Sequence, residues 1–430
     1  MKRKVIIIAV IIISLSTALI ITMITIVFLS GNVHADYTNG KITAVSLKEY
    51  SYEKLTSSGS HDITAEIALS RNIVNIKEDI AVKNTNKKIY IYLPSANTAE
   101  TKIKNVSSDR GEIKVIRHEA MLEIDCNSIP DKISIEYEIE LKQDNNILSY
   151  YGSSAYLGDF LATPAVYDGG KPILGYKSVY GDPYIYETYN YYAVFRIDSS
   201  MEVYAPGEKE ERSFGSNKIV IFEAHDIRDF SAVIMKDANV SVIRNGDTDI
   251  YFINSYEASV DVKAAFDYAQ KMIGPYPYKE LFVVKMPLYH DGMEFSNMIF
   301  LSDSCFNSPN LLKGVAYHEV FHQWFYGIIG TDQLNEPFLD EGLTSYLSGM
   351  LSASSFNGSE SREFLHMRLS DYTSRQEYYR MAYYDSAFYF NGLHRKMGNN
   401  FFKVLQTAYR QYKFKIMYFS DLEKIISEVK

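Results

Sequence analysis

The feature that most limits the possible folds of this chain is a change in hydrophobic periodicity near Tyr256. Before this point short β-rich segments follow one another. The clearest is Ile133–Glu140, where apolar and polar residues alternate so that one face of a strand is apolar. After it, apolar residues recur at helical spacing, beginning with Val260–Ile273, which ends at Gly274-Pro275. Strands first and helices later predict an α+β arrangement in two domains.

The change in pattern also suggests where the domains lie. We predict a β-rich sandwich or saddle-shaped domain over residues 47–247 and a mostly helical domain over 248–430. A short buried strand is expected at Leu281–Met286. The helical patterns in the second domain cover Gly314–Tyr326, Phe338–Leu351, Arg362–Tyr372, Tyr384–Met397, Phe401–Tyr412 and Ser420–Val429.

The composition excludes several classes of protein. The chain is 47% hydrophobic and 23% charged, which rules out wholesale disorder. A net charge of −9 argues against a nucleic-acid partner, because a protein that binds nucleic acid presents a basic surface. Cys126 and Cys305 are the only cysteines, too few for a disulfide scaffold or a cysteine-only metal cluster. Whether the two pair is left open.

The N-terminal 30 residues have the pattern of a membrane anchor. Three basic residues in Met1–Lys4 precede Val5–Leu29, which contains no charged residue. About 20 apolar residues suffice to span a lipid bilayer as a helix, and the apolar region of a cleaved signal is shorter, roughly 7–15 residues. We therefore predict a retained signal anchor over residues 1–30, which contacts the bilayer.

The basic residues before this run also predict its orientation. They keep the N-terminus in the cytoplasm and place the rest of the chain outside the cell. The polar and small residues 31–46 suit a short tether. The alternative is cleavage after Ala35, because Val33-His34-Ala35 is similar to a small-residue cleavage site.

The residues with the clearest chemistry are His318-Glu319-Val320-Phe321-His322, an H-E-x-x-H sequence within a helical pattern. Two histidines four residues apart lie about 40° apart around a helix, so both imidazoles can reach one metal ion. Glu319 lies on the same side, near the metal without having to bind it. A catalytic zinc site needs a third protein ligand and an open position for water. Glu341, with 18 residues between it and His322, is the candidate. Two histidines and one carboxylate suit Zn2+.

The same segment resembles a known family. With Gln323-Trp324-Phe325 after the motif and Glu341-Gly342 downstream, it is similar to the zinc aminopeptidases of the aminopeptidase N type, gluzincins with a thermolysin-like catalytic domain. The similarity extends upstream through Gly274-Pro275-Tyr276-Pro277 and covers most of the chain after the anchor. It implies a thermolysin-like zinc peptidase domain over 248–430, in which Glu319 is the general base.

The resemblance also implies residues that bind substrate. The family's Gly-Ala-Met-Glu-Asn element matches Asp291-Gly292-Met293-Glu294-Phe295, so Glu294 would bind the free α-amine of a peptide. The backbone of Gly292 and Met293 would lie along the substrate. The first and last positions of the element differ here, with Asp291 in place of Gly and Phe295 in place of Asn.

A catalytic tyrosine follows in the family, within a Tyr-x-Lys-Gly turn, where its hydroxyl stabilises the oxyanion. Counting back from Gly398 favours Tyr383 as the matching residue, with Tyr384 as the alternative. The Lys-Gly pair is absent from this chain.

Together these features predict a membrane-anchored zinc metallopeptidase that removes the N-terminal residue from peptide substrates. The printed chain ends at Lys430, without the long helical C-terminal domain of the larger family members, which implies a more open cleft. One alternative is therefore a zinc endopeptidase or a peptidase of narrow specificity. A second is a catalytically idle surface protein that binds peptides.

Overall fold

The computed structural model of the protein describes residues 61–83, 86–94, 100–174, 180, 181, 183 and 185–429, together with the backbone of two strands nearer the N-terminus. These two strands, β1 (Val33–Thr38) and β2 (Lys41–Ser46), pair antiparallel. They belong to a unit of residues 1–60, whereas His61–Lys430 forms a second compact unit. The segment predicted as a tether thus contains a β-hairpin.

The predicted membrane anchor, residues 1–30, lies outside the described residues. In the part of the chain that the structure does describe, no helix is both long enough and apolar enough to cross a bilayer. The anchor, its orientation and the alternative cleavage after Ala35 therefore stay predictions.

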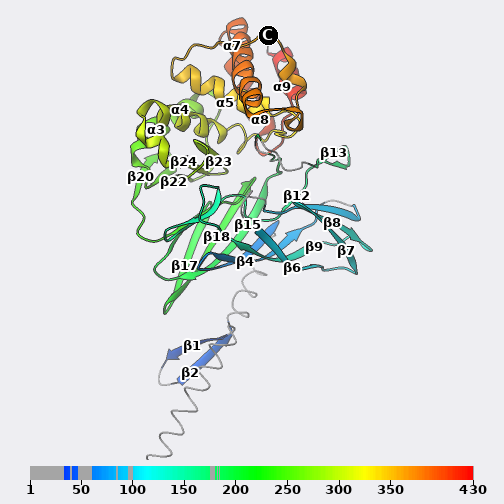
Figure 1. The fold of residues 1–430 in the computed structure, drawn as a ribbon, viewed down its shortest axis with the longest axis vertical. Coiled ribbons are helices and arrows are strands. Elements are labelled where there is room, and N and C mark those ends of the chain that lie inside the picture. Colours follow the sequence, from blue (N-terminus) through cyan, green and yellow to red (C-terminus); the bar gives the residue numbers. More distant parts are fainter. Residues whose placement is uncertain are drawn as a thin grey trace, which may run out of the picture. The chain divides into compact units, whose positions relative to one another are not determined.

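The β-rich part of the second unit is built on a seven-stranded sheet with the order β17-β18-β15-β3-β4-β9-β6 (Figure 1). The alternating segment predicted at Ile133–Glu140 lies in β9, where every second residue is buried. Strand β15 pairs parallel with β3, and the other neighbours pair antiparallel. The strands are β3 (Ile63–Ser70), β4 (Ile73–Ala81), β6 (Glu100–Ser108), β9 (Lys132–Glu140), β15 (Tyr189–Asp198), β17 (Glu208–Phe214) and β18 (Asn217–Ile227).

Smaller sheets complete this part. One has the order β12-β5-β8-β7 and another β10-β11-β19-β16, while β13 and β14 form a short pair. Their bounds are β5 (Lys88–Tyr92), β7 (Ile113–His118), β8 (Met121–Cys126), β10 (Leu148–Tyr151), β11 (Ser154–Leu157), β12 (Thr163–Pro164), β13 (Tyr167–Asp168), β14 (Lys171–Pro172), β16 (Glu202–Tyr204) and β19 (Ala232–Met235). Cys126, on β8, and Cys305 are both buried and free, so they do not pair.

A five-stranded sheet with the order β20-β21-β22-β24-β23 begins the second part. Strands β20 (Val240–Asn245) and β21 (Thr248–Ile253) form an antiparallel hairpin, so a boundary after residue 247 falls inside it. The predicted buried strand lies in β22 (Glu280–Met286), beside β24 (Met298–Ser302). Strand β23 (Gly292–Phe295) is the last of the sheet, which leaves its outer edge for other partners.

Helix α3 comes between β21 and β22 in the chain, and the other helices follow the sheet; α5 to α9 are coloured yellow to red in Figure 1. The predicted helix at Phe338–Leu351 has the predicted bounds, and most others lie within a few residues of theirs. The prediction over Arg362–Tyr372 is wrong, because Met367 and Arg368 are extended and only two 3-10 turns form there. The helices are α3 (Ser259–Met272), α4 (Pro309–His322), α5 (Phe338–Leu351), α6 (Arg375–Tyr378), α7 (Ser386–Met397), α8 (Asn400–Tyr412) and α9 (Phe419–Glu428); the turns are η1 (Tyr256–Ala258), η2 (Asp303–Asn307), η3 (Glu363–His366) and η4 (Leu369–Asp371).

A buried arginine ties the β-rich part to the loop that follows α4. The guanidinium of Arg228 donates hydrogen bonds to the backbone carbonyls of Tyr326, at 2.6 Å, and Ile328, at 3.2 Å. The neighbouring Asp229 accepts a hydrogen bond of 2.8 Å from the hydroxyl of Tyr326. Both side chains are buried, so their loss would leave unpaired polar groups inside the protein. These contacts fix the chain where it leaves α4.

Candidate active site

The two histidines of the H-E-x-x-H sequence lie one turn apart near the C-terminal end of α4. The helix begins where the sequence supplies a cap, because the side chain of Ser308 accepts a hydrogen bond from the backbone of Leu311 and Pro309 occupies the first turn. It ends at His322, four residues earlier than the periodicity predicts. Tyr326 then has a φ of 133°, which breaks the helical path. Helix α5 begins after Pro337 and carries Glu341 in its first turn.

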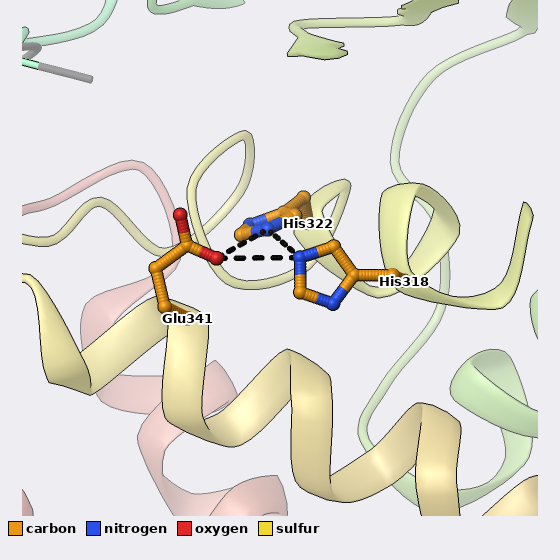
Figure 2. Close-up of side chains that lie close together, drawn as sticks. All are labelled: His318, His322 and Glu341. Carbon is orange, nitrogen blue, oxygen red and sulfur yellow. Dashed lines mark hydrogen bonds and ion pairs between the residues drawn. The ribbon is translucent and has the colours of Figure 1, made fainter. Parts of the chain in front are cut away.

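The predicted ligand atoms converge. His318 Nε2 lies 3.0 Å from His322 Nε2 and 3.2 Å from Glu341 Oε2, and His322 Nε2 lies 3.5 Å from the same oxygen. Figure 2 shows both imidazoles, from α4, turned toward the carboxylate from α5. Bonds of about 2.0–2.2 Å in a tetrahedral arrangement put ligand atoms about 3.3–3.6 Å apart. The observed separations of 3.0–3.5 Å lie within about 0.3 Å of this range, so the three groups are close enough together to hold one zinc ion.

Neighbouring groups orient the ligands. The Nδ1 atom of His322 lies 3.1 Å from the carbonyl oxygen of Phe325, an arrangement in which Nδ1–H donates and Nε2 keeps its lone pair for a metal. The hydroxyl of Tyr383 donates a hydrogen bond of 2.6 Å to Glu341 Oε1, the oxygen that does not face the imidazoles. The ring of Tyr383 also stacks on that of His318, with centroids 5.7 Å apart. Each ligand is thus held in place by groups around it.

The charges of the site also favour a cation. Burial acts to raise the pKa of Glu341, but hydrogen bonds from His318 and His322 outweigh burial and hold that pKa below its usual range. Burial acts to lower the pKa of His322, but the carboxylates of Glu294 and Glu341 outweigh it and raise that pKa well above its usual range. Burial, followed by the charge of Glu341, raises the pKa of Asp340 to about 6. These buried carboxylates stabilise positive charge between them, as a divalent cation requires.

Glu319 lies beside the ligands and packs against Gly292. Its side chain is buried, and a β-carbon at Gly292 would lie only 2.4 Å from Glu319 Oε1. The backbone of β23 therefore approaches this carboxylate more closely than any residue but glycine allows. Glu319, the predicted base, thus packs directly against β23, the strand predicted to lie along the substrate.

Glu294, on β23, is the third carboxylate near His322. It is 4% exposed and accepts a hydrogen bond of 3.4 Å from Gln333 Nε2. The same nitrogen of Gln333 donates a shorter bond, 2.8 Å, to Asp340 Oδ2. Gln333 thereby bridges the predicted amine-binding residue and the start of α5. Neither Gln333 nor Asp340 stands out in the sequence, because no local pattern marks a loop glutamine whose partner Glu294 lies 39 positions away.

The structure separates the two tyrosine candidates. Tyr383 lies in a π-helical segment, η5 (Tyr379–Asp385), which runs into α7. The hydroxyl of Tyr383 reaches Glu341, whereas Tyr384 is 64% exposed. The extra residue per turn of a π-helix changes which side chain faces inward, and such segments are frequent at functional sites. The α-helical period alone therefore does not distinguish the two tyrosines, of which the count back from Gly398 favours Tyr383.

The predicted ligands, base, amine-binding residue and tyrosine open on one cleft with a volume of about 900 Å³. A volume of this size suits a ligand of several residues or a small molecule. The predicted site residues that line the cleft are Gly292, Met293, Glu294, His318, Glu319, His322, Glu341 and Tyr383.

Sequence comparisons agree with this geometry. Residues 256–382 match the Peptidase family M1 domain, a segment that contains both ligand helices and β23. A comparison with curated proteins gives no significant match.

Solved structures share the fold. An M1 zinc metallopeptidase from Deinococcus radiodurans is 11% identical, with a TM-score of 0.62, and the alignment covers 85% of this chain and 90% of that one. A mutant of that enzyme bound to a Tyr-Ser-Ala substrate has a TM-score of 0.58 at 12% identity, with the same coverage. Aminopeptidase A from Legionella pneumophila, in complex with aspartic acid, is 14% identical with a TM-score of 0.63; the alignment covers 87% of this chain and 49% of that one. The family match and the ligand geometry together identify residues 256–382 as a peptidase family M1 domain with the ligand set of a zinc metallopeptidase.

Proposed function

We propose that this metallopeptidase is an aminopeptidase, which hydrolyses the N-terminal residue from peptides. The observation that carries the proposal is the position of Glu294, a buried carboxylate in the same cleft as His318 and His322. A carboxylate beside the metal site pairs with the free ammonium of a peptide. An acetylated N-terminus or an internal residue has no such charge, so the carboxylate would select the first residue of a chain.

The edge of the five-stranded sheet supports this assignment. Strand β23 ends the sheet and carries Gly292, Met293 and Glu294 in succession. An extended peptide can add to such an edge through backbone hydrogen bonds. The substrate backbone would then run along Gly292 and Met293 while its amine meets Glu294.

The chain's own residues account for the proton transfers. When bound by His318, His322 and Glu341, zinc supplies a Lewis acid that acidifies water and polarises the scissile carbonyl. Glu319 would accept the proton of the attacking water and later donate it to the leaving amine. Gly292 leaves room for the carboxylate that does this.

Tyr383 would stabilise the oxyanion. Its hydroxyl has one proton, which it donates to Glu341 at 2.6 Å in the structure. A short turn of the phenol O–H would redirect that proton to a substrate oxygen nearby. Removal of one oxyanion donor typically costs about 3–4 kcal/mol of transition-state stabilisation.

The test compares peptides with free and with acetylated N-termini, alongside aminoacyl-naphthylamides. We expect the free forms to be hydrolysed and Glu319→Ala protein to be inactive while it retains zinc. Glu294→Gln should lower kcat/KM for free-amine substrates by about 10- to 100-fold, because a hydrogen bond to a charged group is lost. Glu257→Gln, which removes an exposed carboxylate far along the chain from this element, is the matched control.

Two other functions appear as distinct outcomes of this test. Equal cleavage of acetylated and free peptides would identify a zinc endopeptidase and exclude Glu294 as the amine anchor. Peptide binding that survives chelation, with no turnover of any substrate, would identify an idle binding protein. The retention of Glu319 and all three ligands speaks against the second outcome.

We also propose that residues 1–30 anchor the enzyme in the cell membrane with its catalytic domain outside the cell. The support is the uncharged run after three basic residues. Resistance to extraction with alkaline carbonate, together with digestion by protease added to intact cells, would agree with this location. Recovery of the full-length protein in the soluble fraction would contradict it.

A further inference from the structure

Among the described residues that line the cleft, Arg375 in α6 is the one arginine, and no lysine lies beside it. Within the same described residues, Arg375 forms no ion pair with a carboxylate; its contacts are with Tyr289. Four carboxylates also line the cleft: Asp291, Glu294, Glu319 and Glu341. Of these, Asp291 lies close enough to the Arg375 corner to act on His290. An anionic substrate group is therefore disfavoured along most of the cleft and favoured beside Arg375.

Tyr289 provides a support for this guanidinium. The carbon Cζ of Arg375 lies 5.3 Å from the centroid of the Tyr289 ring, and one of its nitrogens donates a hydrogen bond of 3.4 Å to the Tyr289 hydroxyl. The backbone of Tyr289 is itself fixed by a hydrogen bond of 2.7 Å to the carbonyl of Asn145. A guanidinium held against an aromatic ring keeps several N–H donors for a planar anion such as a carboxylate.

The next residue, His290, lies in the same corner. Its ring packs edge-on against that of Tyr289, with centroids 5.2 Å apart. Partial burial and then the charge of Arg375 lower the pKa of His290. A neutral imidazole here adds a hydrogen-bonding group without a second fixed charge, so Arg375 supplies the positive charge of this corner.

The direction of β23 places this corner relative to a bound peptide. Tyr289 precedes β23 by three positions, and Glu294 lies near its other end. A peptide whose amine meets Glu294 would therefore extend past Gly292 toward Tyr289. At about 3.3 Å per residue, at most about 17 Å of chain separates Tyr289 from Glu294. A substrate of up to about five residues fills that span.

From these observations, and resting on the proposed aminopeptidase function, we propose that Arg375 forms a subsite for a substrate carboxylate on the far side of the scissile bond from the amine. The carboxylate comes either from the C-terminus of a short peptide or from an acidic side chain that follows the scissile bond. The cleft would thus hold a peptide at both ends, with Glu294 on its ammonium and Arg375 on its carboxylate.

Four substrates test the proposal on the intact protein: Ala-Ala-Ala, its C-terminal amide, Ala-Asp-Ala amide and alanyl-naphthylamide. The wild-type protein should hydrolyse Ala-Ala-Ala, Ala-Asp-Ala amide or both with a higher kcat/KM than Ala-Ala-Ala amide. Arg375→Gln should lower kcat/KM for the favoured substrate by about 10- to 100-fold, mainly through KM. Turnover of Ala-Ala-Ala amide and alanyl-naphthylamide should change less than about twofold, since neither presents a carboxylate.

The pattern identifies the source of the carboxylate. A preference for Ala-Ala-Ala alone indicates the C-terminus, and a preference for Ala-Asp-Ala amide alone indicates an acidic side chain. Arg368→Gln is the matched control, because Arg368 is exposed, pairs with Asp371 and does not line the cleft. Arg375→Lys should restore part of the preference, because it returns the charge without the planar donors.

The outcomes that overturn the proposal are separate from those that overturn the aminopeptidase function. Equal kcat/KM for Ala-Ala-Ala, Ala-Asp-Ala amide and Ala-Ala-Ala amide in the wild-type protein refutes the subsite, even if Arg375→Gln does not fold. An equal loss on all four substrates in folded Arg375→Gln protein also refutes it. No turnover of alanyl-naphthylamide or any tripeptide would refute the proposed function and this inference together.

Discussion

Replacing Gly292 by alanine displaces the carboxylate of Glu319, because the two residues leave no room for a β-carbon. The added carbon would lie 2.4 Å from Oε1, 2.7 Å from Cδ and 2.8 Å from Cγ of Glu319. Ordinary van der Waals contact begins near 3.4 Å, so the carboxylate must move by about 1 Å. A misplacement of about 1 Å at a reacting group can lower a rate about 100-fold. That factor corresponds to about 2.7 kcal/mol in the activation barrier.

The assay is the steady-state hydrolysis of an aminoacyl-naphthylamide, with zinc content and thermal unfolding measured on the same samples. We expect Gly292→Ala to lower kcat about 100-fold while one zinc per chain remains, because the three atoms nearest to the new methyl group all belong to Glu319, which is not a metal ligand. Gly314→Ala is the matched control. Gly314 lies in the same helix as Glu319 and lines the cleft, but a β-carbon there meets no atom within 4 Å.

A double variant separates displacement of Glu319 from a general disturbance of the cleft. If Gly292→Ala acts through Glu319, it should have almost no further effect in a Glu319→Gln background, since residues that act as one unit are not additive. The reasoning is refuted if folded, zinc-loaded Gly292→Ala protein retains kcat within a few-fold of the wild type. It is also refuted if the fold-losses in kcat of the two single variants multiply in the double variant.

Three further predictions concern the tyrosine, the metal and a buried carboxylate in the β-rich part. Tyr383→Phe should lower kcat by about 100- to 1000-fold with little change in KM, whereas Tyr384→Phe should have little effect on either constant. If steady-state kinetics show the larger loss of kcat for Tyr384→Phe, the roles of the two tyrosines are exchanged. Treatment with 1,10-phenanthroline should abolish turnover and lower the melting temperature, and one equivalent of Zn2+ should restore both. Mass spectrometry would measure the metal content and calorimetry the melting temperature. Activity that persists in metal-free protein would exclude the metal site. Burial raises the pKa of Glu78 from 4.5 to about 8. Between these values the folded protein keeps a proton on Glu78 that the unfolded chain has lost. The free energy of unfolding should therefore fall as pH rises from about 5 to 8, by up to about 1.4 kcal/mol per pH unit. Urea unfolding of Glu78→Gln should lack this contribution, and an unchanged pH dependence would contradict it.

Much of the secondary structure could be predicted from local patterns. Strand β9 and helix α5 follow their apolar periodicity, because each buries one face against a single layer. The helix predicted over Arg362–Tyr372 failed because tertiary packing there competes with local preference. Leu369 donates its backbone N–H to the carbonyl of Leu334 instead of to a helical partner, at 2.8 Å. Apolar spacing alone does not distinguish a helix from short turns that bury the same side chains.

The candidate metal ligands could be predicted from the sequence, because the spacing of the two histidines places them on one side of a helix. Two histidines four residues apart share one helical face wherever that helix lies, and the zinc site then needs a carboxylate from a neighbouring element. Only the tertiary structure decided which other groups meet them. The π-helical turn brings the hydroxyl of Tyr383 to Glu341, and the backbone of Gly292 packs closely against Glu319. Arg375 joins the cleft from a segment 86 positions away from Tyr289. These contacts depend on how helices and strands pack across long sequence separations, which no local period records.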